Sequence, residues 1–211
     1  MNGATRLLVL LLLAPVPLRA QGFLEQFSYE GLRFSGIGAA IGGVVSDRLE
    51  PDFAGGVSVD YGNIAPKIRV LLGVSYFRSR FHDAEIARFE DRLESLAPGS
   101  TITIGPITWT DYAGSLDLQY VFTPERRIRP YVGAGLALHV RDGDGAAISD
   151  TFVEDALDAF DAGIAASLGL EIGMIQSLYF TADVRGEATG ELRTLVGRAG
   201  LMFRIPQGGS R

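Results

Sequence analysis

The sequence predicts an all-β protein, an eight-stranded antiparallel up-and-down transmembrane β-barrel with short periplasmic turns and longer extracellular loops. Three observations predict this fold. Apolar and polar side chains alternate with a period of two along eight segments, which places them on opposite faces of strands. The longer segments approach the roughly 9–11 residues that a tilted strand needs to cross a bilayer. Short and longer connections alternate, so the larger loops gather at one end, as in outer-membrane barrels.

The N-terminal residues 1–20 have the pattern of a secretory signal peptide. Arg6 precedes an apolar run at 7–13, and Ala20 supplies the small residue at the expected cleavage site. We therefore expect the barrel domain at 21–211. The apolar run is shorter than the about 20 residues that a spanning helix needs, and no other segment approaches that length. Any membrane embedding then depends on strands.

Composition limits the compartment and the partners. The sequence has no cysteine, so it offers neither a disulfide nor a lipid-anchored thiol. Removing residues 1–20 takes two of the 19 basic residues, Arg6 and Arg19, and leaves 17 against 25 acidic residues. We expect no nucleic-acid partner for so acidic a chain. Lys67 is the only lysine, which is unusual for a soluble domain.

The first three strands are expected at residues 33–44, 53–61 and 67–80. Each alternates apolar residues with Gly, Ala, Ser or charged residues. A break at 46–52 separates the first two strands, and a short turn at 62–66 joins the second to the third.

The period changes between residues 81 and 107. Ile86, Phe89 and Leu93 have helical spacing, which predicts an amphipathic helix over Asp83–Leu96 inside a long loop. Its apolar stripe fits either a partner or the barrel mouth. The acidic balance of this helix argues against an anionic membrane surface. Capping of the mouth or loop decoration is favoured over a partner.

The clearest unit is the hairpin over residues 111–140. Two alternating strands, 111–122 and 129–140, flank a break at 123–128 that contains Pro124. A second long insertion is expected at 141–158, with a capping-box pattern at 151–154.

The last three strands are expected at 160–172, 178–186 and 195–205. The turn between the first two covers 173–177, and a moderate connection covers 187–193. The loops expected at the extracellular end are 45–52, 81–108, 141–159 and 187–194.

Alternation alone does not identify the outer face, because a membrane barrel is apolar outside and a lipocalin-like soluble barrel is apolar inside. Two features, besides the loop asymmetry, favour the membrane barrel. The polar face combines small residues with charges of both signs, as expected of a narrow interior crossed by ion pairs. The apolar face carries aromatic residues near the strand ends, where interfacial girdles lie. The charged residues are Asp60, Arg69, Asp117, Glu171, Asp183, Arg185 and Arg198, and the aromatic residues are Tyr61, Tyr76, Tyr112, Phe122, Phe160 and Phe203.

The chain resembles the small eight-stranded outer-membrane barrels, the opacity-porin and OmpA-type transmembrane domain group. Three segments carry the resemblance: residues 116–122, 129–140 and 196–203. The resemblance covers residues 30–206 and implies assembly by the barrel-assembly machinery in the outer membrane of a Gram-negative-type bacterium. That group usually ends on an aromatic residue, whereas Phe203 here precedes residues 204–211, so either Phe203 with a short tail or another signal directs assembly.

Catalytic and metal-ligating patterns matter here because barrels of this class include lipid A-modifying enzymes, as the resemblance implies. The two histidines are His82 and His139, and no His-x-Ser pair occurs; neither histidine has a nucleophile beside it in the sequence. The acidic stretch that starts at Asp142 has Ala146, Ala147 and Val153 where an EF-hand needs a ligand, Gly and Glu. We therefore expect no catalytic, cofactor-binding or metal-binding residue.

The preferred function is a monomeric outer-membrane barrel with a filled interior and a structural or surface-interaction role. Its loops would contact outer-membrane lipid, lipopolysaccharide or a surface partner. Eight strands leave an interior just wide enough for side chains, so packing is favoured over conduction. Two alternatives stay open at this point: a small pore or transporter for apolar solutes, and a soluble secreted lipocalin-like ligand-binding barrel.

Overall fold

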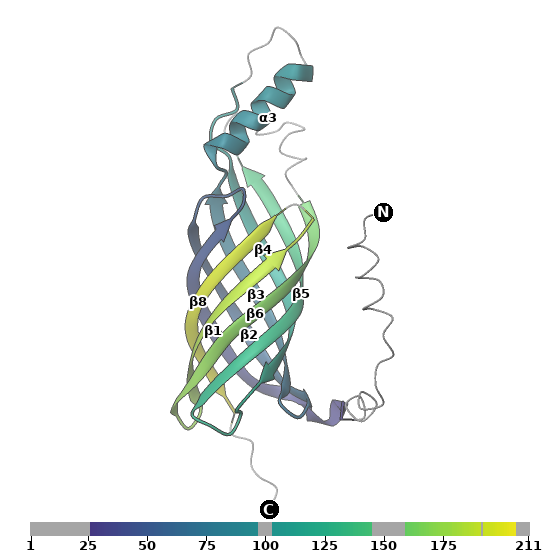
Figure 1. Ribbon diagram of the computed structural model, residues 1–211, viewed down its shortest axis with the longest axis vertical. Helices are drawn as coiled ribbons and strands as arrows, with labels where there is room; N and C mark the ends of the chain where they lie inside the picture. The colour runs from purple at the N-terminus through teal and green to yellow at the C-terminus, as the bar shows by residue number, and fades with distance from the viewer. Residues whose placement is uncertain (1–25, 97–102, 145–158, 191, 206–211) are drawn as a thin grey trace, which may run out of the picture.

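The structure, a computed structural model, describes residues 26–96, 103–144, 159–190 and 192–205. These residues form a closed barrel in which each strand pairs with its sequence neighbours and β8 pairs with β1 (Figure 1). All pairs are antiparallel. The predicted eight-stranded up-and-down barrel is confirmed, and closure leaves no strand edge of the described barrel unpaired.

The strands follow one another around the wall with one helix between β3 and β4. Their bounds are β1 Leu32–Ser46, β2 Asp52–Ala65, β3 Ile68–Arg80, β4 Thr108–Val121, β5 Ile128–Asp144, β6 Ala159–Ile175, β7 Leu178–Ala188 and β8 Arg193–Arg204. A single 3-10 turn, η1 Tyr29–Gly31, precedes β1. Helix α3 spans Asp83–Leu96, the bounds expected from its helical spacing.

Several strands extend beyond their predicted ends. Residues 141–144 were predicted as the start of a loop, and that boundary was wrong: Arg141 pairs with Asp111, and the ladder continues to Asp144 beside Thr108. Arg141 and Gly143 are buried while Asp142 and Asp144 are exposed, so the alternation persists with polar residues on the outer face. Backbone pairing does not depend on apolar side chains, and the strand therefore continues past the apolar band.

The connections make the two ends of the barrel different. At one end β2–β3 and β6–β7 are joined by two residues each, 66–67 and 176–177, and β4–β5 by 122–127. Helix α3 lies at the opposite end (Figure 1), where the chain leaves β3 for the 27-residue β3–β4 connection, residues 81–107. We call these the short-turn end and the long-loop end. Residues 26–31 and the end of β8 lie at the short-turn end.

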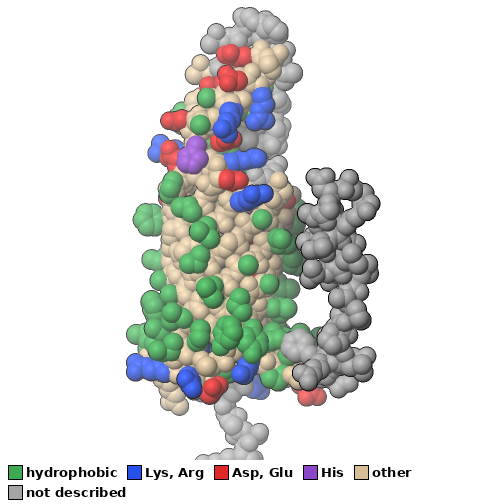
Figure 2. Space-filling view, in the orientation of Figure 1, with side chains coloured by type: hydrophobic (Ala, Val, Ile, Leu, Met, Phe, Trp, Pro, Cys, Tyr) green, Lys and Arg blue, Asp and Glu red, His purple; other side chains and the backbone are tan. Residues whose placement is uncertain are grey.

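The outer wall is apolar. Ile41, Phe53 and Ile164 leave 76%, 84% and 68% of their surfaces exposed, and Figure 2 shows hydrophobic side chains over the wall with charges collected at both ends. The six aromatic residues predicted for the girdles all face outward: Tyr61, Tyr76, Tyr112, Phe122, Phe160 and Phe203. Soluble proteins rarely expose apolar surface on this scale, so the wall is suited to lipid, and the apolar interior of a lipocalin-like barrel is not observed among the described residues.

Helix α3 directs its apolar stripe onto its own loop. Phe89 and Leu93 pack against Ile104 and Ile107, together with Phe81 at the end of β3. The carboxylate of Glu90 accepts a 2.7 Å hydrogen bond from the backbone N–H of Ile104. The helix therefore folds back against the segment that leads into β4, which is the loop decoration expected as one of the two alternatives to partner binding. Within the described residues, no helix has the length and apolar character needed to span a membrane.

Candidate functional site

The charged side chains at inward-facing strand positions lie inside the barrel. All seven charged residues predicted for the interior are buried or half-buried there: Asp60, Arg69, Asp117, Glu171, Asp183, Arg185 and Arg198. Each takes part in a hydrogen bond or an ion pair with another inward-facing side chain. The prediction of an interior crossed by ion pairs is confirmed.

Near the short-turn end, Glu171 on β6 holds two arginines. Its Oε1 lies 2.6 Å from Nη1 of Arg69 on β3 and 2.8 Å from Nη2 of Arg204 on β8. Arg204 also donates from Nε to Asp60 on β2, over 3.0 Å. Only 1% of the Glu171 side chain is exposed. The cluster joins four strands across the lumen, and such closely paired charges tolerate burial because each has two polar partners, although Oε2 of Glu171 has none among the described residues.

A second group lies one layer further in. Tyr131 on β5 donates its hydroxyl hydrogen to Oδ2 of Asp183 over 3.2 Å, and Arg198 donates to Oδ1 of Asp183 from two nitrogens, at 3.0 and 2.8 Å. Arg69 lies over the Tyr131 ring, 5.2 Å from its centroid, and donates to Gln119. The tyrosine thus connects the Arg69 and Arg198 groups.

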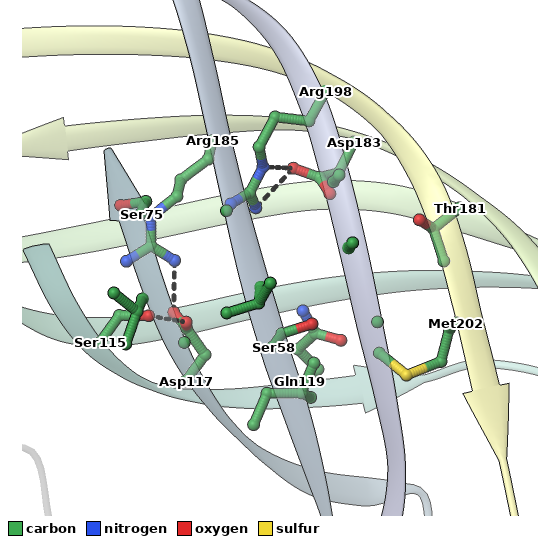
Figure 3. Close-up of a pocket in the computed structure, with 18 of the residues that line it drawn as sticks. Ser58, Ser75, Ser115, Asp117, Gln119, Thr181, Asp183, Arg185, Arg198 and Met202 are labelled. Atoms are coloured by element: carbon green, nitrogen blue, oxygen red, sulfur yellow. Dashed lines mark hydrogen bonds and ion pairs between the residues drawn. The ribbon is translucent and has the colours of Figure 1, made fainter. Parts of the chain in front are cut away.

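The middle of the lumen contains a small cavity of about 80 Å³ (Figure 3). In the figure Arg185 reaches Asp117 on β4, and Arg198 reaches Asp183; the Arg185 Nη1–Asp117 Oδ1 distance is 2.5 Å. The Nη2 of Arg185 is buried without a hydrogen-bond partner among the described residues, which fits a polar cavity that admits water. The volume suits a few water molecules and is well below the roughly 300 Å³ of a typical ligand site.

Two glycines make room for this packing. A Cβ on Gly135 would overlap the carboxylate of Asp117 on the neighbouring strand. A Cβ on Gly169 would lie 2.6 Å from Cζ and from the hydroxyl oxygen of Tyr131. The glycine-rich inner face therefore reflects space for large polar side chains, because eight strands leave little room inside.

His139 lies nearer the long-loop end, between two carboxylates. Its Nδ1 lies 3.0 Å from Asp111 on β4, and its Nε2 lies 2.5 Å from Glu187 on β7, an ion-pair distance without the alignment of a hydrogen bond. The side chain is 4% exposed. Both ring nitrogens thus face carboxylates, and the contacts of His139 are those of a structural group.

Arg141 extends the same cluster to the rim. It donates from Nε to Asp111 over 2.7 Å and from Nη1 to Asp161 over 3.2 Å, and its guanidinium lies 5.1 Å from the Trp109 ring centroid. Arg141 is thus the last inward-facing charge of β5 before the mouth. The sequence had placed this residue in a loop.

An apolar cluster closes the long-loop end above Arg141. Its buried members come from β1, β3, β4 and two connections: Val44, Leu49, Phe77, Trp109 and Leu192. Phe81 stacks on Trp109 with 5.1 Å between ring centroids. Leu49 and Leu192 are 1% and 2% exposed. This mouth is therefore sealed by side-chain packing rather than by charges.

The remaining candidate residues lie apart from one another. His82 is half-buried between β3 and α3, and its backbone N–H donates to Arg48. Asp142 and Asp144 face outward on β5, with Asp144 3.7 Å from Arg78. The rest of the acidic stretch that starts at Asp142, including the capping-box pattern at 151–154, lies outside the described residues. Over the part of the chain that the structure describes, no group of three His, Cys, Asp or Glu side chains is arranged to hold a metal ion.

Besides Arg141, sequence reasoning missed three participants in the interior. Arg204 was assigned to the tail after Phe203, although it shares the parity of Arg198 and Met202, and that parity was the available signal. Glu187 was placed in a loop but faces inward on β7. The apolar cluster had no local signal because Leu49 and Leu192 lie in short connections.

Comparison with solved structures places this fold among bacterial outer-membrane barrels. Neisserial surface protein A is 15% identical, with 82% of this chain and 96% of that chain covered and a TM-score of 0.53. OprG from Pseudomonas aeruginosa is 15% identical, with 83% and 98% covered and a TM-score of 0.54. A major outer membrane protein from Thermus thermophilus is 12% identical, with 81% and 99% covered and a TM-score of 0.50. No protein-family model matches the sequence, and neither does any curated protein sequence.

The chain thus has the fold of the small eight-stranded outer-membrane β-barrels, the group that its sequence resembles. At these identities the likeness establishes the fold and leaves the role to the chain's own residues.

Proposed function

We propose that the protein is a monomeric outer-membrane β-barrel with a filled interior and a structural or surface-interaction role. The observation that carries this proposal is the reversed polarity of the barrel. Apolar side chains such as Ile41 and Ile164 face outward, and ion pairs such as Arg69–Glu171 lie inside. A bilayer is the solvent in which this distribution is favourable.

The decisive experiment is extraction of bacterial envelopes followed by electrophoresis of boiled and unboiled protein. A closed membrane barrel is expected in the outer-membrane fraction, with a mobility that shifts on boiling. Protease should cut the unboiled protein only within the connections 81–107 and 145–158. Recovery in the aqueous phase without a mobility shift would overturn the proposal.

A filled interior argues against the pore for apolar solutes. The Glu171 cluster joins four strands at one end, and the Trp109 cluster packs across the other. The wall is paired around its whole circumference, so the described backbone supplies no lateral opening. We expect no steady conductance in planar bilayers. Stable single-channel steps from purified protein would instead support the pore.

The surface role is assigned to the long-loop end, whose connections between the observed strands, 47–51, 81–107, 145–158 and 189–192, are placed outside the cell. Helix α3 supports this role because it presents charged residues such as Arg88 and Asp91 to solvent while its apolar side packs on Ile104 and Ile107. Outer-membrane lipid, lipopolysaccharide or a surface partner would meet this end. Replacing 83–106 with a short turn should leave heat-modifiability intact and reduce binding of cells or vesicles to the partner surface.

The protein would be exported with a cleaved signal peptide and then assembled into the outer membrane. Signal peptidase would cleave after Ala20, and N-terminal sequencing of the mature protein tests that site. Phe203 faces outward at the short-turn end of β8, beside Ile37 and Leu178, where the last strand would be read by the barrel-assembly machinery. Phe203→Ala should lower the amount of assembled protein more than Phe160→Ala, a change of the same kind at the other girdle. No enzymatic step is assigned.

A further inference from the structure

The short-turn end of the barrel opens into a polar vestibule. Its volume is about 440 Å³, more than five times that of the cavity in the middle of the lumen. It is lined by four cationic side chains, Lys67, Arg69, Arg129 and Arg204, and by Asp60. Neutral groups on the same wall include Asn63, Gln176 and Tyr179. A concave site with several convergent donors is the usual form of a binding site for a small polar ligand.

The floor of the vestibule is internally neutralised. Arg69 is engaged by Glu171 and Gln119, and Arg204 by Glu171 and Asp60. The charges of two arginines and two carboxylates thus cancel, and these four side chains need no further ligand. The charge that the vestibule presents to a ligand comes from the other two cations.

Lys67 and Arg129 make no ion pair within 4 Å among the described residues, although Arg129 lies opposite Glu171 in the β5–β6 ladder and acts on that carboxylate at longer range. The Nζ of Lys67 donates to the backbone oxygen of Phe122, over 3.4 Å. Arg129 donates from Nε to the backbone oxygen of Arg126 and lies 4.5 Å from the Tyr179 ring centroid. Its guanidinium is therefore positioned by an aromatic face while its terminal nitrogens keep donors for another group.

The backbone at Lys67 adds a separate observation. Lys67 has a φ of +67°, the left-handed region that normally takes Gly or Asn at this place in a two-residue turn. Such a conformation costs about 1 kcal/mol or more in a residue with a Cβ, and strained positions cluster at binding sites. The only lysine of the chain occupies this position, and its side chain lines the vestibule.

We propose that the vestibule binds an oxyanion, a phosphate group above all, between Lys67 and Arg129. Arginine offers two parallel donors to phosphate oxygens, and lysine supplies a compact second charge. Gln176 and Asn63 supply neutral amide donors on the same wall. The phosphate belongs either to a small soluble ion or to a lipid headgroup at the rim. This site lies at the opposite end from the loops and is independent of the surface role.

The test uses the full mature protein in nanodiscs of zwitterionic phosphatidylcholine, with radiolabelled inorganic phosphate in equilibrium dialysis. Wild-type protein is expected to bind saturably with one phosphate per barrel. Lys67→Gln and Arg129→Gln should each weaken binding about fivefold, and the double variant should abolish it. Arg126→Gln is the matched control, because Arg126 is an exposed arginine on the same rim that does not line the vestibule.

Two results would overturn the proposal: no saturable binding by the wild type, or an equal loss in Arg126→Gln, which would mean unspecific attraction to a basic rim. Retained heat-modifiability of each variant separates lost binding from lost folding. A second set of nanodiscs containing phosphatidylglycerol assigns the source. Competition by this lipid identifies a headgroup as the occupant, and unchanged phosphate affinity identifies a soluble ion.

Discussion

The two ends of the barrel interior are closed by different physical means. At the short-turn end, the carboxylate of Glu171 joins Arg69 and Arg204 across the lumen, and a polar vestibule lies beyond them. At the long-loop end, Trp109, Leu49 and Leu192 pack into an apolar cluster under the connections. One end is specified by charge pairing between fixed strands, and the other by burial of apolar surface contributed by loops.

The two ends should differ in how strongly a substitution destabilises the barrel. A buried ion pair is costly to break because the remaining charge has no water to replace its partner. An apolar cluster loses the transfer free energy of the atoms removed plus a cavity term, and a mouth formed by short connections can partly collapse around the gap. The charged end should therefore be the more sensitive of the two. Substitutions at Glu171 and at Trp109 test whether the charged end is the more sensitive.

The largest effect is expected at the charged end. Glu171→Gln keeps the side-chain shape but leaves Arg69 and Arg204 without their shared charge, and should lower the free energy of unfolding by about 3–5 kcal/mol. Urea unfolding in lipid vesicles, followed by electrophoretic mobility, measures it. The control is Glu125→Gln in the exposed β4–β5 turn, which should leave the transition unchanged. An equal effect of the two changes would contradict the assigned role of Glu171.

The apolar end should respond somewhat less. Trp109→Ala removes the stacking partner of Phe81 and the ring under Arg141, and should cost about 3 kcal/mol. The same urea titration measures it. Protease sensitivity within 81–107 should also rise, because the segment leading from α3 into β4 loses its anchor. If Trp109→Ala proves more costly than Glu171→Gln, the proposed order of the two ends is wrong.

His139 lies between the charged interior and the apolar mouth. His139→Ala removes the group shared by Asp111 and Glu187 and should cost about 2 kcal/mol, since each carboxylate keeps one arginine. A double-mutant cycle with Asp111→Asn measures the coupling. Strictly additive effects would show that the 3.0 Å contact between these residues contributes nothing.

The smallest effect has the opposite sign. Lys67→Asn places a residue that tolerates positive φ in the β2–β3 turn, and should stabilise the barrel by about 0.5–1 kcal/mol. The same variant should weaken phosphate binding about fivefold, as Lys67→Gln should. Stabilisation together with weakened binding would show that strain at Lys67 is retained for the vestibule. Destabilisation would instead show that its side chain supports the turn.

Much of the architecture could be predicted because its signals are local. A period of two identifies a strand wherever one face meets lipid and the other meets polar side chains. The change to helical spacing at Ile86, Phe89 and Leu93 gave the bounds of α3. Parity also separated inward residues such as Asp117 and Arg185 from outward ones such as Leu116 and Val184. These inferences need no knowledge of which strands pair.

The ends of the strands were harder to predict from the sequence. Residues 141–144 alternate like a strand but lack apolar residues on their outer face, so the pattern stops at the apolar band while the ladder with β4 continues. The inward orientation of Arg204 was hard to predict for a related reason. It follows the last aromatic residue of β8, and only its parity indicated that it faces inward.

By itself, then, the sequence determined the fold class, the polarity of the wall and seven of the charges inside, because each depends on residues one or two positions apart. Only the tertiary structure decided which charge meets which. Arg204 and Asp60 are 144 positions apart and meet because β8 closes on β1 and brings β2 within reach. The apolar cluster and the vestibule likewise form where separate connections meet at the two ends of a closed barrel. No local sequence pattern predicts which connections meet.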